Sequence, residues 1–435
     1  MTSNLPVIFV LTGVKTNLVR KADLLGENPG IGGTHWVTLQ IAARIAARAA
    51  YPVHIVLVGS GGNEWVQQNL VIQQVSKLRQ AVPAAGTVAI TPASVARHMG
   101  GEWSRSELIV VLHHPHVGRL ELSPGVQPRA FVSVGQYAWH SNKSVNSAVK
   151  HVWIPNPFPT WAIRNQQDMS KQANSPPTFG YVGALVPAKG FHLVARAWRQ
   201  ICESDVLPGA KLEVIGAKSL YGLGDEHGVV PTSWEYGNRI LMELGDSADT
   251  VSFLGRIGQG KLAKFSRWTA GFGNPTGASE ADPSSAKELI AAGVPLVAAA
   301  DFGMWDMMRF FPQFVARRPG NISRLGVQAA IDPSLRTAFF RSRRVALRHS
   351  LAVDRQLEVL WMELIGSLYS RQLQHAGIVG SFPKADTPTG LIGLRLSVRR
   401  RASDIVMSLN PRVQQRVRQI VQTIRAVGAS HRRLQ

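Results

Sequence analysis

The sequence predicts an α/β protein with two halves, each built on a parallel sheet that helices cover on both faces. Short apolar runs rich in β-branched residues alternate with helical patterns over most of the 435 residues. This alternation is typical of parallel sheets, because crossover helices bury both faces of the strands. The length also exceeds what one hydrophobic core commonly supports, which favours two or three domains.

The expected strands are short, apolar and well separated along the chain. They cover residues 7–11, 54–58, 108–112, 152–154, 179–182, 212–215, 251–254 and 296–298. A segment rich in Asn, Gln, Ser and Pro follows the fourth strand over 158–177 and has no apolar period, as in a linker. We therefore expect a first domain over 1–160, a linker over 161–177 and a second domain over 178–350.

Two helices have clear apolar stripes. The first, over 35–50, places apolar side chains on one side at a spacing of four residues, Val37, Ile41 and Ile45, and polar ones on another, Gln40, Arg44 and Arg48. The second runs from about 354 to 369 with Leu357, Leu360, Trp361, Leu364 and Leu368 on one stripe. We expect the segment 351–371 to cross back and pack on the first domain.

Composition and charge limit the classes of protein. Hydrophobic residues make up 45% and charged residues 17%, which is typical of a globular protein. Cys202 is the single cysteine, so no disulfide forms within the chain and a reducing cytoplasm is expected. The apolar start at 6–11 has no basic region before it and is interpreted as a core strand, not a signal peptide. The longest apolar stretch, 289–300, is too short to span a bilayer.

The net charge of +21 is concentrated near the C-terminus. Residues 371–435 hold twelve Lys and Arg against two Asp, a net charge of +10. Within this tail, Asn410 and Pro411 are typical of a helix start, and a helix over 411–427 would have an apolar face and a basic face. Such a helix can lie on an anionic inner leaflet, or it can pack on the protein itself. Nucleic acid is not expected as a partner, because no aromatic residues interleave with the arginines.

The most informative motif lies between two expected strands of the second half. Glu280 falls in a loop, and Glu288 falls on a helix that begins near Ser284 and Ser285. The free N–H groups of a helix start favour a bound anion, and the two carboxylates can accept hydrogen bonds from sugar hydroxyls. Alternatively, these acids are a solvated loop residue and a partner of a neighbouring lysine.

This motif resembles one of a known family. Two glutamates separated by seven residues and followed by small residues, Gly293, Pro295 and a strand are similar to the E-x7-E motif of retaining glycosyltransferases with the GT-B fold (glycosyltransferase family 4-like, group 1). That fold has two Rossmann-like domains facing a central cleft. The resemblance covers about residues 5–370. It implies that Glu280 faces the donor sugar, that Glu288 binds the ribose, and that the backbone at Ser284 and Ser285 meets the diphosphate.

A second segment resembles the family's diphosphate clamp. In the family a Gly-Arg-Leu sequence precedes a turn and Lys-Gly, and Lys189 matches that lysine. A lysine there can neutralise a phosphate. The arginine of the clamp is missing, since Ala184 occupies its position, and Arg256 is the candidate replacement. A solvated turn residue is the alternative interpretation of Lys189.

Two further candidates come from the first half. Gly32 and Gly33 belong to a loop whose glycines allow a ligand close to the backbone, although many strand–helix loops are similar. Three histidines at 113, 114 and 116 follow a strand, where ligands of α/β sheets bind. The family often has a histidine here, and His114 is our choice for a catalytic role beside Glu280, with a structural role as the alternative. No metal site is expected, because the three share one short turn.

Together with these features, the resemblance implies a hexosyltransferase that uses a nucleoside-diphosphate sugar and no metal or other cofactor. By that resemblance it would transfer the hexose with retention to a hydroxyl of a glycan or lipid-linked acceptor, in cell-surface polysaccharide synthesis in bacteria. We expect it in the cytoplasm and on the inner leaflet, reached through 411–427 of the basic tail at 372–435. Alternatives are an epimerase or phosphorylase of the same fold, or an inactive protein that binds nucleotide sugars or other anions.

Overall fold

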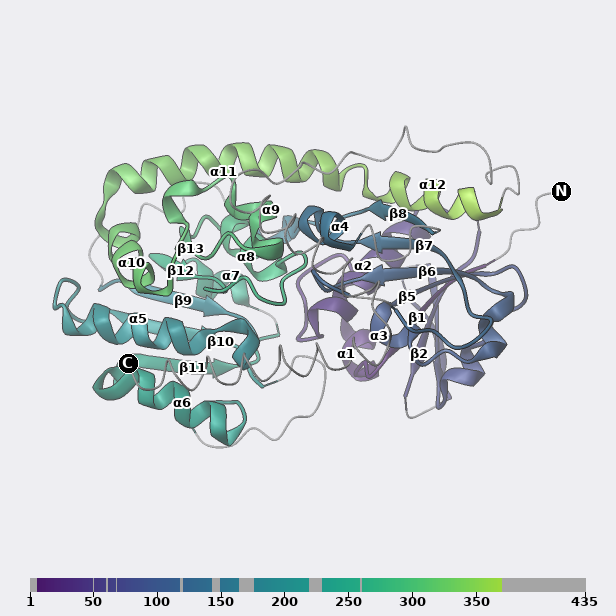
Figure 1. Ribbon diagram of the computed structural model, residues 1–435, viewed down its shortest axis with the longest axis horizontal. Coiled ribbons are helices and arrows are strands. Elements are labelled where there is room, and N and C mark those ends of the chain that lie inside the picture. Colours follow the sequence, from purple (N-terminus) through teal and green to yellow (C-terminus); the bar gives the residue numbers. More distant parts are fainter. Residues whose placement is uncertain are drawn as a thin grey trace, which may run out of the picture. The chain divides into compact units, whose positions relative to one another are not determined.

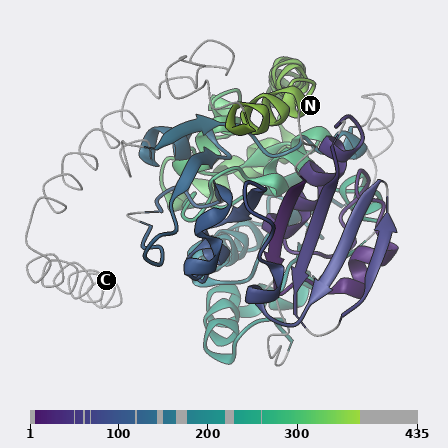
Figure 2. The same ribbon diagram turned by 90° about the vertical axis from the view of Figure 1, so that its right-hand side faces the viewer.

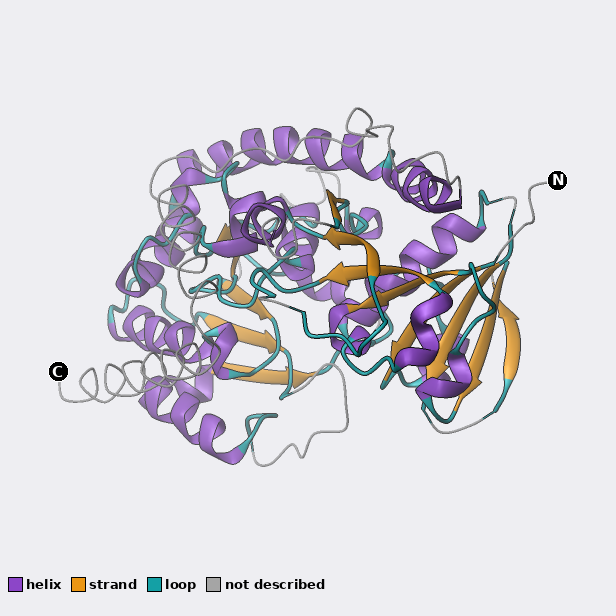
Figure 3. Cartoon of the chain, turned by 45° about the vertical axis from the view of Figure 1, so that its right-hand side comes forward, coloured by secondary structure: helices purple, strands orange, loops and turns teal. Residues whose placement is uncertain are grey.

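The structure is a computed structural model that describes residues 6–49, 51–59, 62–67, 69–117, 120–142, 149–163, 176–218, 229–258 and 260–369. These residues form two separate sheets (Figures 1 and 3). The expected helix over 411–427 and the rest of the basic tail lie outside the described residues. All eight expected strands are present, and the predicted α/β class is confirmed, with parallel pairing throughout both sheets except at the edge strand β3.

The first sheet has eight strands in the order β3-β4-β2-β1-β5-β6-β7-β8 (Figure 2). Their bounds are β1 Val7–Thr12, β2 Val53–Val58, β3 Glu64–Gln67, β4 Leu70–Val75, β5 Val88–Pro92, β6 Glu107–Leu112, β7 Pro128–Ser133 and β8 Lys150–Trp153. Neighbours pair in parallel except β3 and β4, which are antiparallel. The associated helices are α1 Thr16–Lys21, α2 Gly33–Ala46, α3 Ala93–Ala96 and α4 Gln136–Asn142.

Both faces of this sheet are buried, because successive side chains of a strand point to opposite faces. In β1, Phe9 and Leu11 belong to a core that includes α2, whereas Val10 belongs to a second core on the other face. The nearly continuous apolar runs of the sequence follow from this two-sided burial.

The second sheet has five parallel strands in the order β11-β10-β9-β12-β13. Their bounds are β9 Thr178–Val182, β10 Lys211–Ile215, β11 Val251–Gly255, β12 Ala270–Phe272 and β13 Leu296–Val297. The helices are α5 Phe191–Glu203, α6 Trp234–Leu244, α7 Lys261–Phe265, α8 Ser284–Ala291, α9 Trp305–Met308, α10 Ile322–Ile331 and α11 Pro333–Asp354.

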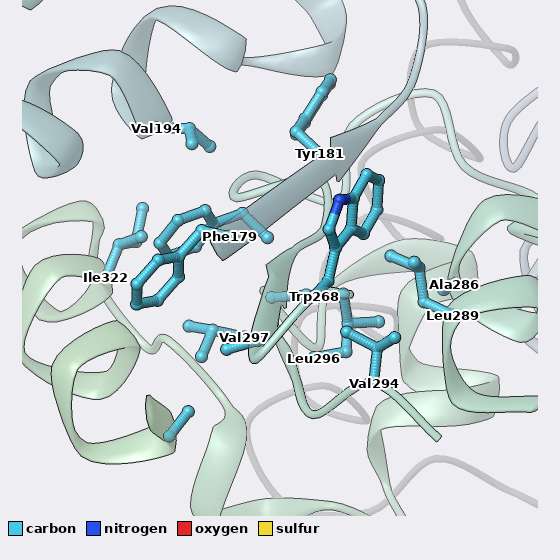
Figure 4. Close-up of a cluster of buried hydrophobic side chains, with 14 of the residues drawn as sticks. Phe179, Tyr181, Val194, Trp268, Ala286, Leu289, Val294, Leu296, Val297 and Ile322 are labelled. Atoms are coloured by element: carbon cyan, nitrogen blue, oxygen red, sulfur yellow. The ribbon is translucent and has the colours of Figure 1, made fainter. Parts of the chain in front are cut away.

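Close packing of an indole on the central strand holds this sheet together. Trp268 is buried against β9 at Gly180, where an added Cβ would overlap the indole ring (Figure 4). Its Nε1 donates to Glu213 Oε2 at 2.8 Å, so the polar atom of the buried ring is satisfied. Phe179 of the same strand stacks on Phe272 of β12.

The last described helix, α12 Leu357–Tyr369, shares a core with the first sheet although it follows the second. Leu357, Leu360 and Trp361 pack in the same cluster as β1 and α2. Arg44 of α2 pairs with Asp354 at 3.0 Å and with Glu358 at 3.7 Å. The polar side of α2 that the sequence shows is therefore covered by acidic residues of the C-terminal helices.

Helix bounds differ from the expected ones in two places. The expected helix 35–50 is α2 Gly33–Ala46. The expected helix 354–369 is two helices, because α11 ends at Asp354 and α12 begins at Leu357.

Candidate functional site

The candidate residues of the second half lie at the carboxyl ends of parallel strands. Lys189 follows β9, Arg256 follows β11, and Glu280 follows β12. Because β11, β10, β9 and β12 are neighbours and parallel, their carboxyl ends form one edge of the sheet. Ligands of open α/β sheets bind at this edge.

Lys189 and Glu280 are in direct contact. Lys189 Nζ donates to Glu280 Oε1 at 2.7 Å, across 91 positions of sequence. The two side chains are 24% and 13% exposed, so the pair is partly shielded from water. The structure thus brings together a basic and an acidic candidate that the sequence places in separate motifs.

The loop that carries Glu280 is shaped by residues with left-handed backbone. Gly277 has a φ of 63° and Ser279 a φ of 62°. Asn274 organises the loop, since its Nδ2 donates to Ala278 O at 2.9 Å and to Glu280 Oε1 at 3.3 Å. Glu280 is fixed at its backbone as well, because its carbonyl accepts from the N–H of Gly303 at 2.9 Å. Asn274 is a functional candidate that sequence reasoning missed.

The helix start after Glu280 is open. α8 begins at Ser284 with Pro283 before it, and no side chain of the described residues caps the helix. No described residue accepts a hydrogen bond from the N–H groups of Ser284 or Ser285. These amides and the positive end of the helix dipole are suited to an anion.

Glu288 lies one turn into α8 and is buried. Burial raises the pKa of its carboxyl, while Lys261, whose Nζ lies 3.6 Å from Glu288 Oε2, lowers it. Lys261 begins α7, and the Glu27 carboxylate accepts from the N–H of Gly260 at 3.0 Å and of Lys261 at 2.8 Å. Neither Glu27 nor Lys261 was expected in the site.

Several contacts between described segments join the edge of the second sheet to that of the first. Gly258 and Pro29 are so close that a Cβ on Gly258 would lie 2.7 Å from Pro29 O. A second contact joins Glu27 to α7. In a third, Gly135, which follows β7, lies against Ala281, and an added Cβ would overlap the Ala281 carbonyl. The carboxyl ends of the two sheets therefore meet.

The glycine loop of the first half lies at this junction. Asn28 Oδ1 accepts from the N–H of Gly30 at 2.9 Å and of Ile31 at 2.7 Å, which fixes the turn before α2. Gly32 precedes α2, and Gly33 is its first residue. A Cβ at Gly33 would meet no described atom within 4 Å, so the described part of the chain leaves space next to its backbone.

The histidines after β6 have different environments. His114 is exposed, and its Nδ1 lies 2.8 Å from His116 O. His113 Nε2 is buried, and no described residue forms a hydrogen bond with it. Burial, and secondly His35, lower the pKa of His113 to about 3, and burial lowers the pKa of His35 to about 4. His113, the residue before the predicted His114, is thus a neutral imidazole near the glycine loop.

Two aspartates of the second half bind backbone of the first. Asp306 accepts from the N–H of Gln136 at 2.6 Å and of Tyr137 at 3.2 Å, at the start of α4. Burial, and secondly the charge of Asp282, raise the pKa of Asp306 to about 7. Asp282 accepts from the N–H of Asn156 at 3.0 Å and pairs with Lys287 at 2.6 Å. These residues hold the halves together beside Glu280, and no local sequence signal identifies them.

Two Rossmann-like domains whose carboxyl edges meet, with a C-terminal helix returning to the first domain, define the GT-B fold. Solved structures of glycosyltransferases with this fold are similar to the chain. Sucrose-phosphate synthase from Thermosynechococcus elongatus aligns at a TM-score of 0.60 and 15% identity, over 83% of this chain and 100% of that one.

Two other solved structures are similar at the same level. The UDP-forming α,α-trehalose-phosphate synthase from Burkholderia vietnamiensis aligns at a TM-score of 0.57 and 11% identity, over 85% of this chain and 98% of that one. HepE from Anabaena, solved in complex with UDP and glucose, aligns at a TM-score of 0.55 and 13% identity, over 82% of this chain and 100% of that one. At these identities the likeness establishes the fold. No protein-family model matches the sequence, and no curated protein matches it significantly.

Two further properties concern the described residues alone. None of their helices is long and apolar enough to cross a membrane. No group of three His, Cys, Asp or Glu side chains among them could hold a metal ion.

Proposed function

We propose that this protein is a retaining hexosyltransferase of the E-x7-E type that uses a nucleoside-diphosphate sugar as donor. The observation that carries the proposal is the convergence of Lys189, Glu280 and the uncapped start of α8 at one sheet edge. A nucleoside-diphosphate sugar needs a cation and N–H donors for its phosphates and acceptors for its sugar hydroxyls. This edge offers all of them.

The diphosphate binds between Lys189 and the N–H groups of Ser284 and Ser285. Negative charge develops on the leaving phosphate as the glycosidic bond breaks, and preorganised donors stabilise that charge. Arg256, which follows β11 at the same edge of the sheet, supplies the second positive charge that Ala184 does not. No metal takes part, because Lys189, Arg256 and the helix start provide the positive charge.

The sugar and the nucleoside occupy the two sides of the diphosphate. Glu280 accepts hydrogen bonds from the hexose hydroxyls, and Glu288 accepts from the ribose. Lys189 turns from Glu280 to the phosphate when the donor binds, which releases a carboxylate oxygen for the sugar. His114 and the loop at Gly32 and Gly33 approach the reacting sugar from the first domain.

The acceptor is a hydroxyl of a glycan or lipid-linked sugar held by the first domain. Binding both substrates between the two domains makes the reaction effectively unimolecular, which supplies much of the rate. A role in bacterial cell-surface polysaccharide synthesis, with the enzyme in the cytoplasm and at the inner leaflet, agrees with the basic charge of the chain.

Ala184 favours one rival, an inactive nucleotide-sugar-binding protein, because it removes half of the family's clamp. An epimerase or phosphorylase of the same fold is the other rival. The candidates differ in whether they release nucleoside diphosphate. A transferase releases it in step with acceptor glycosylation, an epimerase releases it without an acceptor, and a phosphorylase or a binding protein releases none.

The test is an assay of nucleoside-diphosphate release from UDP-, GDP- and ADP-hexoses, with and without membrane extract as acceptor. The anomeric configuration of the product is read by NMR. Wild type is compared with Glu280→Gln and with Glu64→Gln, a control on the exposed edge strand β3. We expect acceptor-dependent release that Glu280→Gln lowers about 100-fold or more and Glu64→Gln leaves unchanged. Equal release by wild type and Glu280→Gln would contradict the proposal.

A further inference from the structure

The exposed side of α11 carries a row of arginines that do not contribute to the packing of the described residues. Arg341, Arg344 and Arg348 are exposed and recur at intervals of three and four, so they lie on one side of the helix. No described residue forms a hydrogen bond or ion pair with their guanidinium groups. α11 has 22 residues and is a long helix at the edge of its domain (Figure 1).

A neighbouring arginine of the same helix has a structural role, and its contacts provide a comparison. Arg343 is buried, and its Nε donates to Ile290 O at 2.8 Å and its Nη2 to Ala291 O at 2.5 Å. It ties α11 to the end of α8. The three exposed arginines make no such contacts with any described residue.

The acidic residues nearest to the row in the sequence are engaged elsewhere. Between residues 307 and 353 the sequence has nine arginines and a single acid, Asp332. Asp332 caps the start of α11 by accepting from the N–H of Ser334 at 2.8 Å. Asp354, at the other end, is buried and accepts from Arg44 and from the N–H of Phe158. Both carboxylates are thus engaged away from the row.

An exposed apolar side chain lies within the row. Val345, between Arg344 and Arg348, is 56% exposed, and Ile331 just before α11 is 53% exposed. The two aromatic residues of α11, Phe339 and Phe340, pack on the core instead. A straight basic face with an apolar side chain suits the surface of an anionic bilayer, whereas single-stranded nucleic acid would favour exposed aromatic rings.

We propose that the outer face of α11, centred on Arg341, Arg344 and Arg348, docks this protein on an anionic lipid surface. The guanidinium groups bind lipid phosphates, and Val345 enters the headgroup region. This surface is separate from the sheet edge proposed to bind the donor, and it does not depend on that activity.

The test is sedimentation of the full chain with vesicles of phosphatidylcholine alone or mixed in equal parts with phosphatidylglycerol. The variant R341Q/R344Q/R348Q is compared with R79Q/R97Q/R105Q, which removes the same charge from exposed arginines of the first domain. We expect the α11 variant to lower partitioning onto anionic vesicles about 100-fold. The control variant should lower it by a few-fold at most.

Equal losses in the two variants, or no loss in the α11 variant, would overturn the proposal. So would loss of binding to a DNA oligonucleotide with unchanged vesicle binding. A second variant, Val345→Glu, should weaken vesicle binding also in high salt, where charge is screened. A thermal-shift response to nucleoside diphosphates that survives in R341Q/R344Q/R348Q separates failure of this surface from failure of the donor site.

Discussion

Lys189 Nζ lies 2.7 Å from Glu280 Oε1, so the lysine after β9 and the glutamate after β12 form one ion pair at the edge of the second sheet. The pair joins the two motifs on which the proposed function depends. When no donor is bound, the ammonium group of Lys189 and the carboxylate of Glu280 neutralise each other. A diphosphate would compete with Glu280 for the lysine.

Lys189→Met should change stability little, because partly exposed ion pairs contribute modestly. We expect the free energy of unfolding to fall by about 1 kcal/mol or less. Urea unfolding followed by circular dichroism measures it. A loss of several kcal/mol would show that Lys189 is mainly structural.

Asp306 should make the stability depend on pH. Its pKa is raised to about 7 in the folded protein from 3.8, so the unfolded chain releases the proton at lower pH. The contribution of Asp306 to stability therefore falls as pH rises from about 4 to 7, by up to about 1.4 kcal/mol per pH unit, and is constant above that range. Asn does not titrate, so the free energy of unfolding of Asp306→Asn minus that of wild type should rise between pH 5 and pH 7.

The matched control for this experiment is Asp332→Asn. Hydrogen bonds from Ser334 lower the pKa of the exposed Asp332 carboxyl, so it is ionised in both states over the same range. Its effect on stability should not vary between pH 5 and 8. Urea unfolding at several pH values compares the three proteins, and a pH-independent difference between wild type and Asp306→Asn would contradict the account.

Arg44 and Arg48 offer a test of how α12 is attached to the first domain. The Arg44 side chain is 15% exposed and bridges Asp354 and Glu358, whereas Arg48 is 58% exposed and lies 3.5 Å from Glu358. Arg44→Met leaves the buried carboxylate of Asp354 without its charged partner and should cost about 3 kcal/mol. Arg48→Met should cost less than about 1 kcal/mol. Thermal unfolding measures both variants. Similar losses of stability in Arg44→Met and Arg48→Met would contradict this prediction.

Gly135 should not tolerate a side chain. A Cβ there would overlap the Ala281 carbonyl and lie 2.8 Å from Asp306 Oδ2, where the two domains meet. We expect Gly135→Ala to cost several kcal/mol, as steric overpacking does. Gly366→Ala in α12, where a Cβ would meet no described atom within 4 Å, should instead gain about 0.5–1 kcal/mol. The prediction fails if the two variants shift the denaturant midpoint in the same direction.

Much of the fold could be predicted because buried parallel strands are continuous apolar runs. Five of the described strands were not predicted: β3, β4, β5, β7 and β12. β12 has three residues, and β3 at the sheet edge has the polar ends Glu64 and Gln67. In β4, β5 and β7 the apolar run is short, because Gln, Thr-Pro or Pro-Arg residues take up part of the strand. The polar side of α2 was also hard to interpret. Its partners, Asp354 and Glu358, lie some 310 positions away, which no local period can reveal.

The candidate site was predictable where a motif is local, as for Glu280, Glu288 and the start of α8. Residues that act across the domains were not. Glu27 and Asp306 bind backbone N–H groups more than 160 positions away. Their flanking sequence does not distinguish them from other acidic residues in loops. Their function follows only from the packing of the two sheets.

The most direct test of the central claim is a thermal-shift titration with UDP, GDP, ADP and their sugars. Wild type is compared with Lys189→Met and with Lys211→Met, which removes an exposed lysine at the start of β10. We predict that one nucleotide raises the melting temperature of wild type and Lys211→Met, and that Lys189→Met weakens its binding about 10- to 100-fold. An equal shift in all three proteins, or none in wild type, would contradict a donor site at Lys189 and Glu280.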